Sequence, residues 1–251
     1  MKKLIVIIFV FLTVSCNRYF PVRELRFDGM KGNVESVKMS RYEAYKQFGE
    51  ISKDEDDIEY VIRQKFDEDG FLIENIHYNR YGEEAYECFL TYEDGYLSEF
   101  TEVHHQRYGK NEIKGKRVEL SNNYACWEYD GYDYKSTVTS FDNTMVNGCY
   151  HQIMQNENGT MVSEKYIRKD GMELIIRRFD NEGNLRLEEI NELDDNDLVI
   201  EKMQVFHNSG EAYSLMLKYE YTSFDEYGNW TERIVDESGD LYVEERKIRY
   251  R

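Results

Sequence analysis

Apolar and polar residues alternate along most of this 251-residue chain, with the period of two that places successive side chains on opposite faces of a β-strand. The alternation is clear in two widely separated sets of apolar positions: Ile58, Tyr60, Ile62 and Phe66, and Leu215, Leu217, Tyr219 and Tyr221. Charged residues such as Arg63 and Lys218 occupy intervening positions. Helical periodicity is sustained nowhere, so the pattern predicts strands with one buried face.

A turn signal recurs between these strands, with Asp or Asn near its start and Gly after it. The copies read FDEDGFL at Phe66, YNRYGEEA at Tyr78, YEDGYL at Tyr92, MQNENGTM at Met154, IRKDGMEL at Ile167, FDNEGNL at Phe179, FHNSGEA at Phe206, FDEYGNW at Phe224 and VDESGDL at Val235. Because glycine adopts positive φ without a steric penalty, each copy predicts a type I turn with a glycine bulge. The spacing of twelve residues between Gly159, Gly171 and Gly183 fits one strand plus one turn.

These signals predict an all-β fold: a long antiparallel meander of short strands joined by DxxG-type hairpin turns, forming a curved or rolled single sheet. One domain is expected to span residues 32–251. Pro21 is the only proline, so no later strand lacks a backbone donor. Each repeat then turns the chain and supplies an aromatic ring for cross-strand stacking, which contributes up to ~1 kcal/mol per pair.

The first fifteen residues have the features of a secretory signal peptide. Two lysines precede an apolar run, Leu4–Leu12, that is too short to span a bilayer. Cys16 comes directly after Ser15, in a pattern that resembles the lipobox of bacterial lipoproteins, where this cysteine is acylated and becomes the mature N-terminus. A plain cleaved signal that happens to precede a cysteine is the alternative.

The lipobox resemblance implies where the protein resides. We expect residues 1–15 to be removed, Cys16 to anchor the chain in the membrane, and residues 16–31 to form a linker. Asn17 differs from the Asp that retains lipoproteins in the inner membrane, so an outer-membrane lipoprotein is favoured. The absence of acids from residues 17–23 favours a periplasm-facing domain.

The copy FDEYGNWTER at 224–233, preceded by YEY, resembles the YD repeat of the rearrangement-hotspot (Rhs) and wall-associated protein families. The chain is also similar to bacterial lipoproteins of unassigned function with degenerate YD-like repeats. The resemblance covers most of residues 60–251. In the Rhs family such repeats coil into a large sheet around a toxin; with fewer copies here, the resemblance implies a shorter curved or rolled sheet.

The formal net charge of −18 excludes some classes of partner. An acidic surface repels phosphate backbones, so nucleic acid is not expected as a ligand, and the acidity is attributed to solubility.

Cysteines and histidines offer few candidates for chemistry. Cys126 and Cys149 are the closest cysteine pair, and the sequence leaves open whether they form a disulfide. With Cys88 they make an odd number, and buried structural thiols are favoured over nucleophiles. His104 and His105 are adjacent, so on a strand they point to opposite faces and cannot share one metal ion without a bulge.

Two acidic runs are candidate calcium sites: 54–57 (DEDD) and 194–197 (DDND). Neither has the spacing of an EF-hand, so solvated loops are favoured. Neither a metal nor a cofactor is expected.

The segment YACWEYDGYDY at 124–134 interrupts the regular repeat, which favours a distinct loop. It brings together four aromatic residues that are candidates for ligand binding, although stacking between strands is the alternative: Trp127, Tyr129, Tyr132 and Tyr134.

Together these patterns favour a non-enzymatic, lipid-anchored envelope protein that acts as a β-repeat scaffold or binding module, with another envelope protein or a glycan as its partner. A periplasmic glycan-binding protein, or a glycan hydrolase with paired carboxylates, is the alternative. A calcium-stabilised structural module is a third hypothesis.

Overall fold

The described part of the chain folds into sixteen β-strands and no helix. A computed structural model describes residues 30–106, 109–121, 124–131, 135–146, 149–168, 172–208 and 211–251. No helix in these ranges is suited to crossing a membrane. The strands are β1 (Val34–Gln47), β2 (Glu50–Phe66), β3 (Leu72–Asn79), β4 (Glu84–Glu93), β5 (Tyr96–Gln106), β6 (Gly109–Leu120), β7 (Tyr124–Asp130), β8 (Ser136–Val146), β9 (Cys149–Asn156), β10 (Met161–Arg168), β11 (Glu173–Phe179), β12 (Leu185–Leu193), β13 (Val199–Asn208), β14 (Glu211–Phe224), β15 (Trp230–Glu237) and β16 (Asp240–Tyr250).

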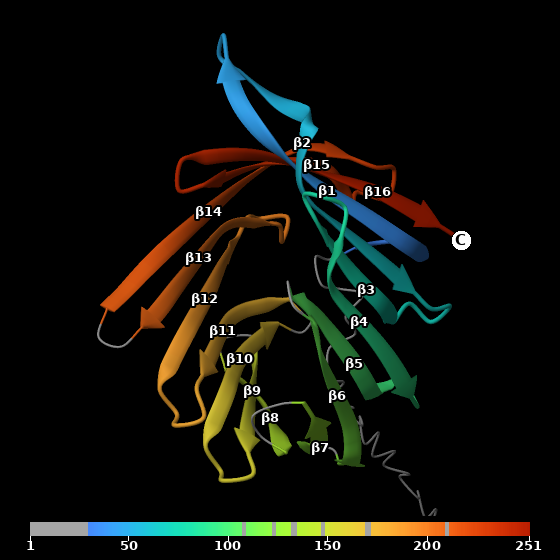
Figure 1. The fold of residues 1–251 in the computed structure, drawn as a ribbon, viewed down its shortest axis with the longest axis vertical. Coiled ribbons are helices and arrows are strands. Elements are labelled where there is room, and N and C mark those ends of the chain that lie inside the picture. Colours follow the sequence, from blue (N-terminus) through green and yellow to red (C-terminus); the bar gives the residue numbers. More distant parts are fainter. Residues whose placement is uncertain are drawn as a thin grey trace, which may run out of the picture.

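Each strand pairs antiparallel with its neighbours in sequence, and β1 pairs with β16, so the sheet is a closed barrel. Figure 1 shows the first strand, in blue, alongside the last, in red. The predicted all-β antiparallel meander is therefore confirmed, and the curved or rolled sheet, whose closure the sequence left open, is not an open sheet but a closed barrel. An open sheet would leave two strands with unpaired backbone groups, and the β1–β16 ladder pairs both edges with each other.

The turn chemistry follows the sequence prediction. In the copy headed by Asp225, the Oδ1 atom accepts hydrogen bonds from the backbone N–H groups of Tyr227 and Asn229, both at 2.9 Å, and Gly228 has φ of 79°. The same pair of backbone hydrogen bonds to the head side chain occurs at four other turns, headed by Asn79, Asn156, Asp180 and Asp194. These turns join strands without long loops.

Two of the predicted turns that the structure describes in full have a different geometry. Asp94–Gly95 and Ser238–Gly239 have positive φ at both positions, and they connect the directly paired residues Glu93 with Tyr96 and Glu237 with Asp240. They are two-residue turns, whose twist matches that of the flanking strands.

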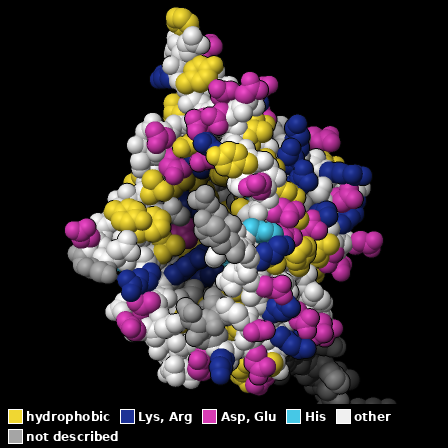
Figure 2. Space-filling view, in the orientation of Figure 1, with side chains coloured by type: hydrophobic (Ala, Val, Ile, Leu, Met, Phe, Trp, Pro, Cys, Tyr) yellow, Lys and Arg dark blue, Asp and Glu magenta, His cyan; other side chains and the backbone are white. Residues whose placement is uncertain are grey.

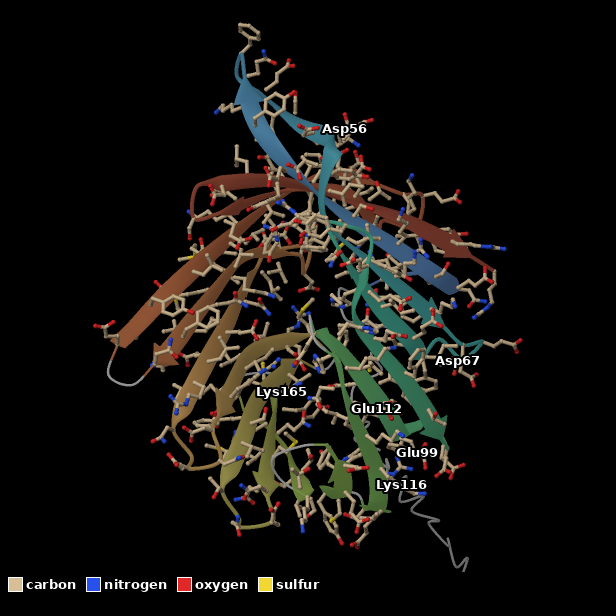
Figure 3. The ribbon with its side chains drawn as sticks, viewed as in Figure 1. Asp56, Asp67, Glu99, Glu112, Lys116 and Lys165 are labelled. Carbon is tan, nitrogen blue, oxygen red and sulfur yellow. The ribbon has the colours of Figure 1, made fainter. Side chains whose placement is uncertain are left out.

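The acidic run 54–57 lies within β2, not in a loop. Here the β1–β2 register jumps, with Tyr42 opposite Ile58 and Ala44 opposite Lys53. The β1–β2 hairpin projects beyond the barrel, and Asp56 lies on this projection (Figure 3). The run is thus a solvated irregularity in a paired strand.

The ladder registers place one continuous set of side chains on the inner wall. Val37, Cys88 and Ile113 belong to it, and all three are buried. The alternate set faces outward and carries ion pairs such as Lys65 with Glu74 at 2.7 Å. The alternation predicted for 215–221 is confirmed, because Leu217, Tyr219 and Tyr221 pair with Glu237, Val235 and Arg233 of the inner wall.

The inner wall is not uniformly packed. A barrel of eight strands can be filled by its own side chains, whereas sixteen strands enclose more space than side chains fill. An apolar cluster closes part of one end through Val34, Val37, Phe66 and Leu72. Elsewhere many inner side chains, including Tyr86 and Phe100, remain partly exposed.

Candidate functional site

An aromatic patch lies on the inner wall where β5, β6 and β7 meet. It comprises Phe100, Trp127 and Tyr129, with the Phe100 ring centroid 5.9 Å from that of Trp127 and 6.0 Å from that of Tyr129. All three side chains are partly exposed. Tilted contacts at these distances are favourable arrangements for aromatic rings, and the exposed parts of the rings remain available to a ligand.

Gly115 explains how Phe100 reaches its two neighbours. It lies directly opposite Phe100 on β6 and opposite Tyr129 through β7. A Cβ atom at position 115 would lie 2.1 Å from the Phe100 ring, so the ring occupies the space that a side chain would fill. Glycine within a strand often marks such a close approach.

Polar groups frame the patch. The hydroxyl groups of Tyr129 and Thr137 share a 2.8 Å hydrogen bond, and Thr137 is 1% exposed. Arg117 pairs with Trp127 across the β6–β7 ladder, and its guanidinium lies 6.0 Å from the Tyr96 ring. The site therefore combines partly exposed rings with hydroxyl and guanidinium groups, a composition typical of small-molecule binding.

A very different group, the ionic cluster, occupies the inner wall of β1, β2, β15 and β16. Arg233 Nε and Nη2 lie 2.7 and 2.6 Å from Glu244 Oε2, and Glu244 also accepts a 3.1 Å hydrogen bond from the Tyr60 hydroxyl. Arg41 contacts Glu244 and Glu59, at 3.8 and 2.9 Å, and it also pairs with Glu237.

Aromatic rings pack around this cluster. The Arg41 guanidinium lies 3.7 Å from the Tyr242 ring, and that of Arg233 lies 4.3 Å from both the Tyr219 and the Trp230 rings. Trp230 is 2% exposed. Because charges and rings fill the space together, this part of the interior is closed to a ligand.

Burial and charge act on the pKa values in this cluster. Burial raises the pKa of Tyr219 to about 12. Burial opposes the positive charge of Arg233, but Glu244 and nearby tyrosines outweigh it and raise the pKa of that guanidinium. Burial also raises the pKa of Glu59, despite the neighbouring Arg41. The arginines thus stay charged, and the cluster is an ion-paired packing unit.

The structure brings together two of the four predicted aromatic candidates. Trp127 and Tyr129 share the inner wall, whereas Tyr132 and Tyr134 lie outside the described residues, as does the predicted lipidation site Cys16. The loop predicted for 124–134 is wrong for its first seven residues, which form β7. The ladder with β6 and β8 holds them as a strand despite the irregular spacing of the repeat.

Sequence reasoning missed Phe100 and Gly115. Phe100 is one of many strand aromatics, and its proximity to Trp127 depends on the β5–β6–β7 register. The isolated glycine in EIKGKRVEL was the available signal, because glycine inside a strand indicates a bulge or a close approach.

His104 and His105 point to opposite faces, as strand alternation predicts. The His104 ring packs against Tyr86 on the inner wall, with centroids 5.0 Å apart, and His105 Nε2 lies 2.6 Å from Glu87 Oε1 on the outer wall. The described cysteines are thiols: Cys126 and Cys149 form no disulfide, and Cys126 Sγ lies 4.0 Å from Glu119 Oε2.

The acidic run 194–197 forms one of the repeated turns. Asp194 Oδ1 accepts backbone hydrogen bonds from Asn196 and Leu198, and Asp197 takes the positive-φ position. The backbone hydrogen bond from Leu198, together with that from Asn196, lowers the pKa of Asp194 against the opposing effect of burial. The carboxylate therefore stabilises the turn itself.

Comparisons with known proteins show a distant likeness in structure alone. No protein-family model matches the sequence, and no curated protein matches it. A porin-like protein from Bacteroides uniformis aligns at a TM-score of 0.39 with 8% identity, over 86% of this chain and 98% of that one. A DUF1329 family protein from Desulfovibrio piger aligns at 0.23 with 13% identity, over 86% of each chain. The likeness to YD repeats stays a prediction.

Proposed function

We propose that this protein is a non-enzymatic, lipid-anchored envelope protein whose barrel interior binds a small ligand at the aromatic patch. The observation that carries the proposal is the group of three partly exposed rings, Phe100, Trp127 and Tyr129, on the inner wall of the barrel. Enclosed, mostly apolar sites with a few polar groups are the usual places for small ligands.

The chemistry of the patch favours a glycan as the ligand. Sugar rings offer an apolar face that stacks on aromatic rings and hydroxyl groups that hydrogen-bond at the edge. Trp127 and Tyr129 supply stacking surfaces, and the Tyr129 hydroxyl, held by the buried Thr137, and the Arg117 guanidinium are the polar groups beside them. An envelope location would place the patch among such ligands.

The charged side chains of the outer wall favour a barrel that is attached to the membrane through Cys16 over a barrel that spans the membrane. Arg177 lies 2.7 Å from Glu188 and 2.9 Å from Glu164 across three neighbouring strands. Acidic and basic side chains are interspersed over the face in Figure 2. A membrane-spanning barrel carries an outward apolar band about 25 Å tall, and these charged ladders do not resemble one.

The hydrolase alternative has less support. Glu237 and Glu244 both converge on Arg41, so their charges are compensated within the ionic cluster. A glycosidase needs one carboxyl group that donates a proton and a second that acts as base or nucleophile, on opposite sides of a substrate. The binding function is therefore favoured.

The chain contains two tryptophans, Trp127 and Trp230, which makes binding directly measurable. In a Trp230→Phe variant, envelope glycan fragments are expected to change the fluorescence of Trp127 in a saturable way. Replacing Phe100 by Ala should weaken binding by about 1–3 kcal/mol, by analogy with the loss of a ring that stacks on a nucleic-acid base. Unchanged fluorescence with every glycan class would contradict a glycan ligand.

A further inference from the structure

The outer wall carries two histidine–glutamate pairs with nearly the same geometry. His105 Nε2 lies 2.6 Å from Glu87 Oε1, and His151 Nε2 lies 2.8 Å from Glu164 Oε1. The exposed fractions of the paired side chains are also similar, at 20% and 16% for the first pair and 22% and 13% for the second. The two pairs therefore differ mainly in what else lies beside them.

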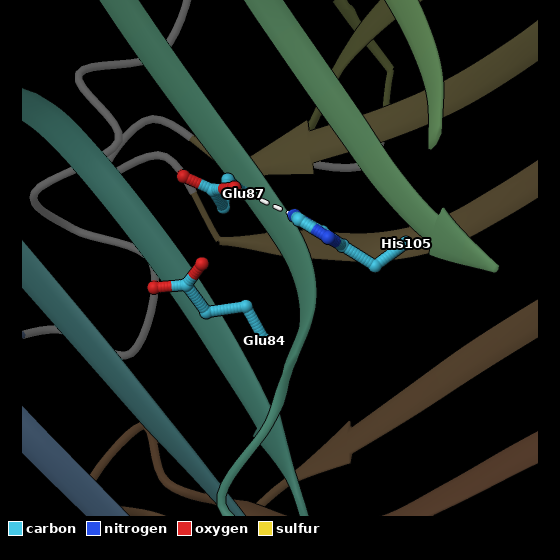
Figure 4. Close-up of side chains that lie close together, drawn as sticks. All are labelled: Glu84, Glu87 and His105. Carbon is cyan, nitrogen blue, oxygen red and sulfur yellow. Dashed lines mark hydrogen bonds and ion pairs between the residues drawn. The ribbon is translucent and has the colours of Figure 1, made fainter. Parts of the chain in front are cut away.

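The third neighbour has opposite charge in the two places. Glu164 pairs with Arg177 at 2.9 Å, and Arg177 also pairs with Glu188. Beside His105 and Glu87 lies a second carboxylate, Glu84, and one potential ligand atom from each of these three residues falls within 4.8 Å of the others. Figure 4 shows these three side chains on the neighbouring strands β4 and β5.

A β-bulge brings the two glutamates to one face. Along the β3–β4 ladder His77 pairs with Tyr86 but Tyr78 pairs with Glu84, so Ala85 is an extra residue on β4. Without it, Glu84 and Glu87, which are three apart, would point to opposite faces. Bulges often redirect a side chain at a functional position.

We infer that Glu84, Glu87 and His105 form a site for a divalent transition-metal ion of the Zn²⁺ type. One imidazole nitrogen and two carboxylate oxygens are suitable ligands at about 2.0–2.2 Å, and water completes a four-coordinate sphere. Imidazole favours Zn²⁺ and its neighbours over Ca²⁺ or Mg²⁺, which prefer oxygen ligands.

The local charge is consistent with this site. Lys110 pairs with His105 across the β5–β6 ladder and is exposed to solvent, so its ammonium group can remain in water. Two carboxylates against one lysine leave a net negative charge for a divalent cation to neutralise. At His151, Arg177 already occupies the equivalent role.

The experiment titrates the purified full chain, held in detergent, with Co²⁺, followed by Zn²⁺ competition. The visible bands of Co²⁺ report its coordination, and one saturable site per chain is expected. His105→Ala and Glu84→Gln should each lower the affinity by about tenfold or more, because even the loss of a partner beyond the direct ligands produces an effect of that size. His151→Ala is the matched control and should leave binding unchanged.

Glu84→Gln separates metal binding from folding, because Glu84 is exposed and its replacement keeps the His105–Glu87 contact. Circular dichroism of each variant verifies the sheet. Absence of a saturable site, or equal loss of binding in His151→Ala and His105→Ala, would overturn the proposal.

Discussion

The two sides of the barrel interior are lined by different kinds of side chain and are filled to different extents. Around β15 and β16, Arg41, Arg233 and Glu244 fill the space with paired charges and rings. Around β6 and β7, Phe100 and Trp127 line the wall but remain partly exposed. The ionic cluster fills its side of the interior, and the aromatic patch leaves part of its ring surface exposed to a ligand.

The difference also follows chain topology. The ionic cluster lies where the first and last strands meet, so its ion pairs join residues far apart in sequence, such as Arg41 and Glu244. The aromatic patch is built from three consecutive strands. Contacts between residues distant in sequence therefore join the two ends of the sheet, whereas the aromatic patch is formed by neighbouring hairpins.

The largest expected effect comes from breaking the ionic cluster. Glu244→Ala would leave Arg233 and Arg41 buried beside a missing carboxylate, and removing one partner of a buried pair costs about 3–5 kcal/mol. Urea unfolding measures this loss. Glu74→Ala, at the more exposed Lys65 pair on the outer wall, is the control and should cost less than about 1 kcal/mol. Equal losses would show that the ionic cluster contributes no more to the free energy of unfolding than an exposed ion pair does.

A smaller effect is expected at the aromatic patch. Gly115→Ala places a methyl group in the space of the Phe100 ring and should destabilise the protein by about 1–3 kcal/mol, as overpacking does. The displaced ring should also weaken glycan binding. In the double variant Gly115→Ala, Phe100→Leu, the loss of stability should be less than the sum of the single losses; strict additivity would contradict the steric explanation.

The smallest effect concerns the repeated turns headed by Asp or Asn. Backbone and side-chain hydrogen bonds from Asn184 lower the pKa of Asp180 from 3.8 to about 2. Because the folded pKa is lowered, this carboxylate stabilises the fold above about pH 4, and the contribution is lost as pH falls towards 2.

Asp180→Asn tests this contribution. Asn79 and Asn156 head the same turn, so the variant should fold at neutral pH and show a flatter loss of stability between pH 4 and pH 2. Thermal unfolding across that range is the measurement. If the stability of Asp180→Asn fell between pH 4 and pH 2 as steeply as that of the unchanged protein, Asp180 would not contribute to the pH dependence.

The local features of this fold were predictable because they depend on short-range chemistry. The Asp225 turn needs an acceptor at its head and a glycine at positive φ, and both are visible in FDEYGNW. Barrel closure was not predictable, because the pairing of Val37 with Ile248 depends on the twist accumulated over all the strands between them.

The candidate sites were predictable only in part, because they too combine short-range patterns with strand pairing that the local sequence does not determine. Trp127 and Tyr129 share a face because they are two apart on a strand, which alternation predicts. The strand itself was mistaken for a loop, since its turn signals are irregular. Glu84 and Glu87 meet His105 through an extra residue on β4, and no short sequence pattern announces that bulge.

The most direct test of the contrast between the two sides is acrylamide quenching of each tryptophan alone. In Trp230→Phe, the emission of Trp127 should be quenched readily, because its ring is partly exposed on the inner wall. In Trp127→Phe, the emission of Trp230 should be protected, because Trp230 is 2% exposed within the ionic cluster. Equal quenching of the two, or stronger protection of Trp127, would contradict an interior that is closed on one side and open to a ligand on the other.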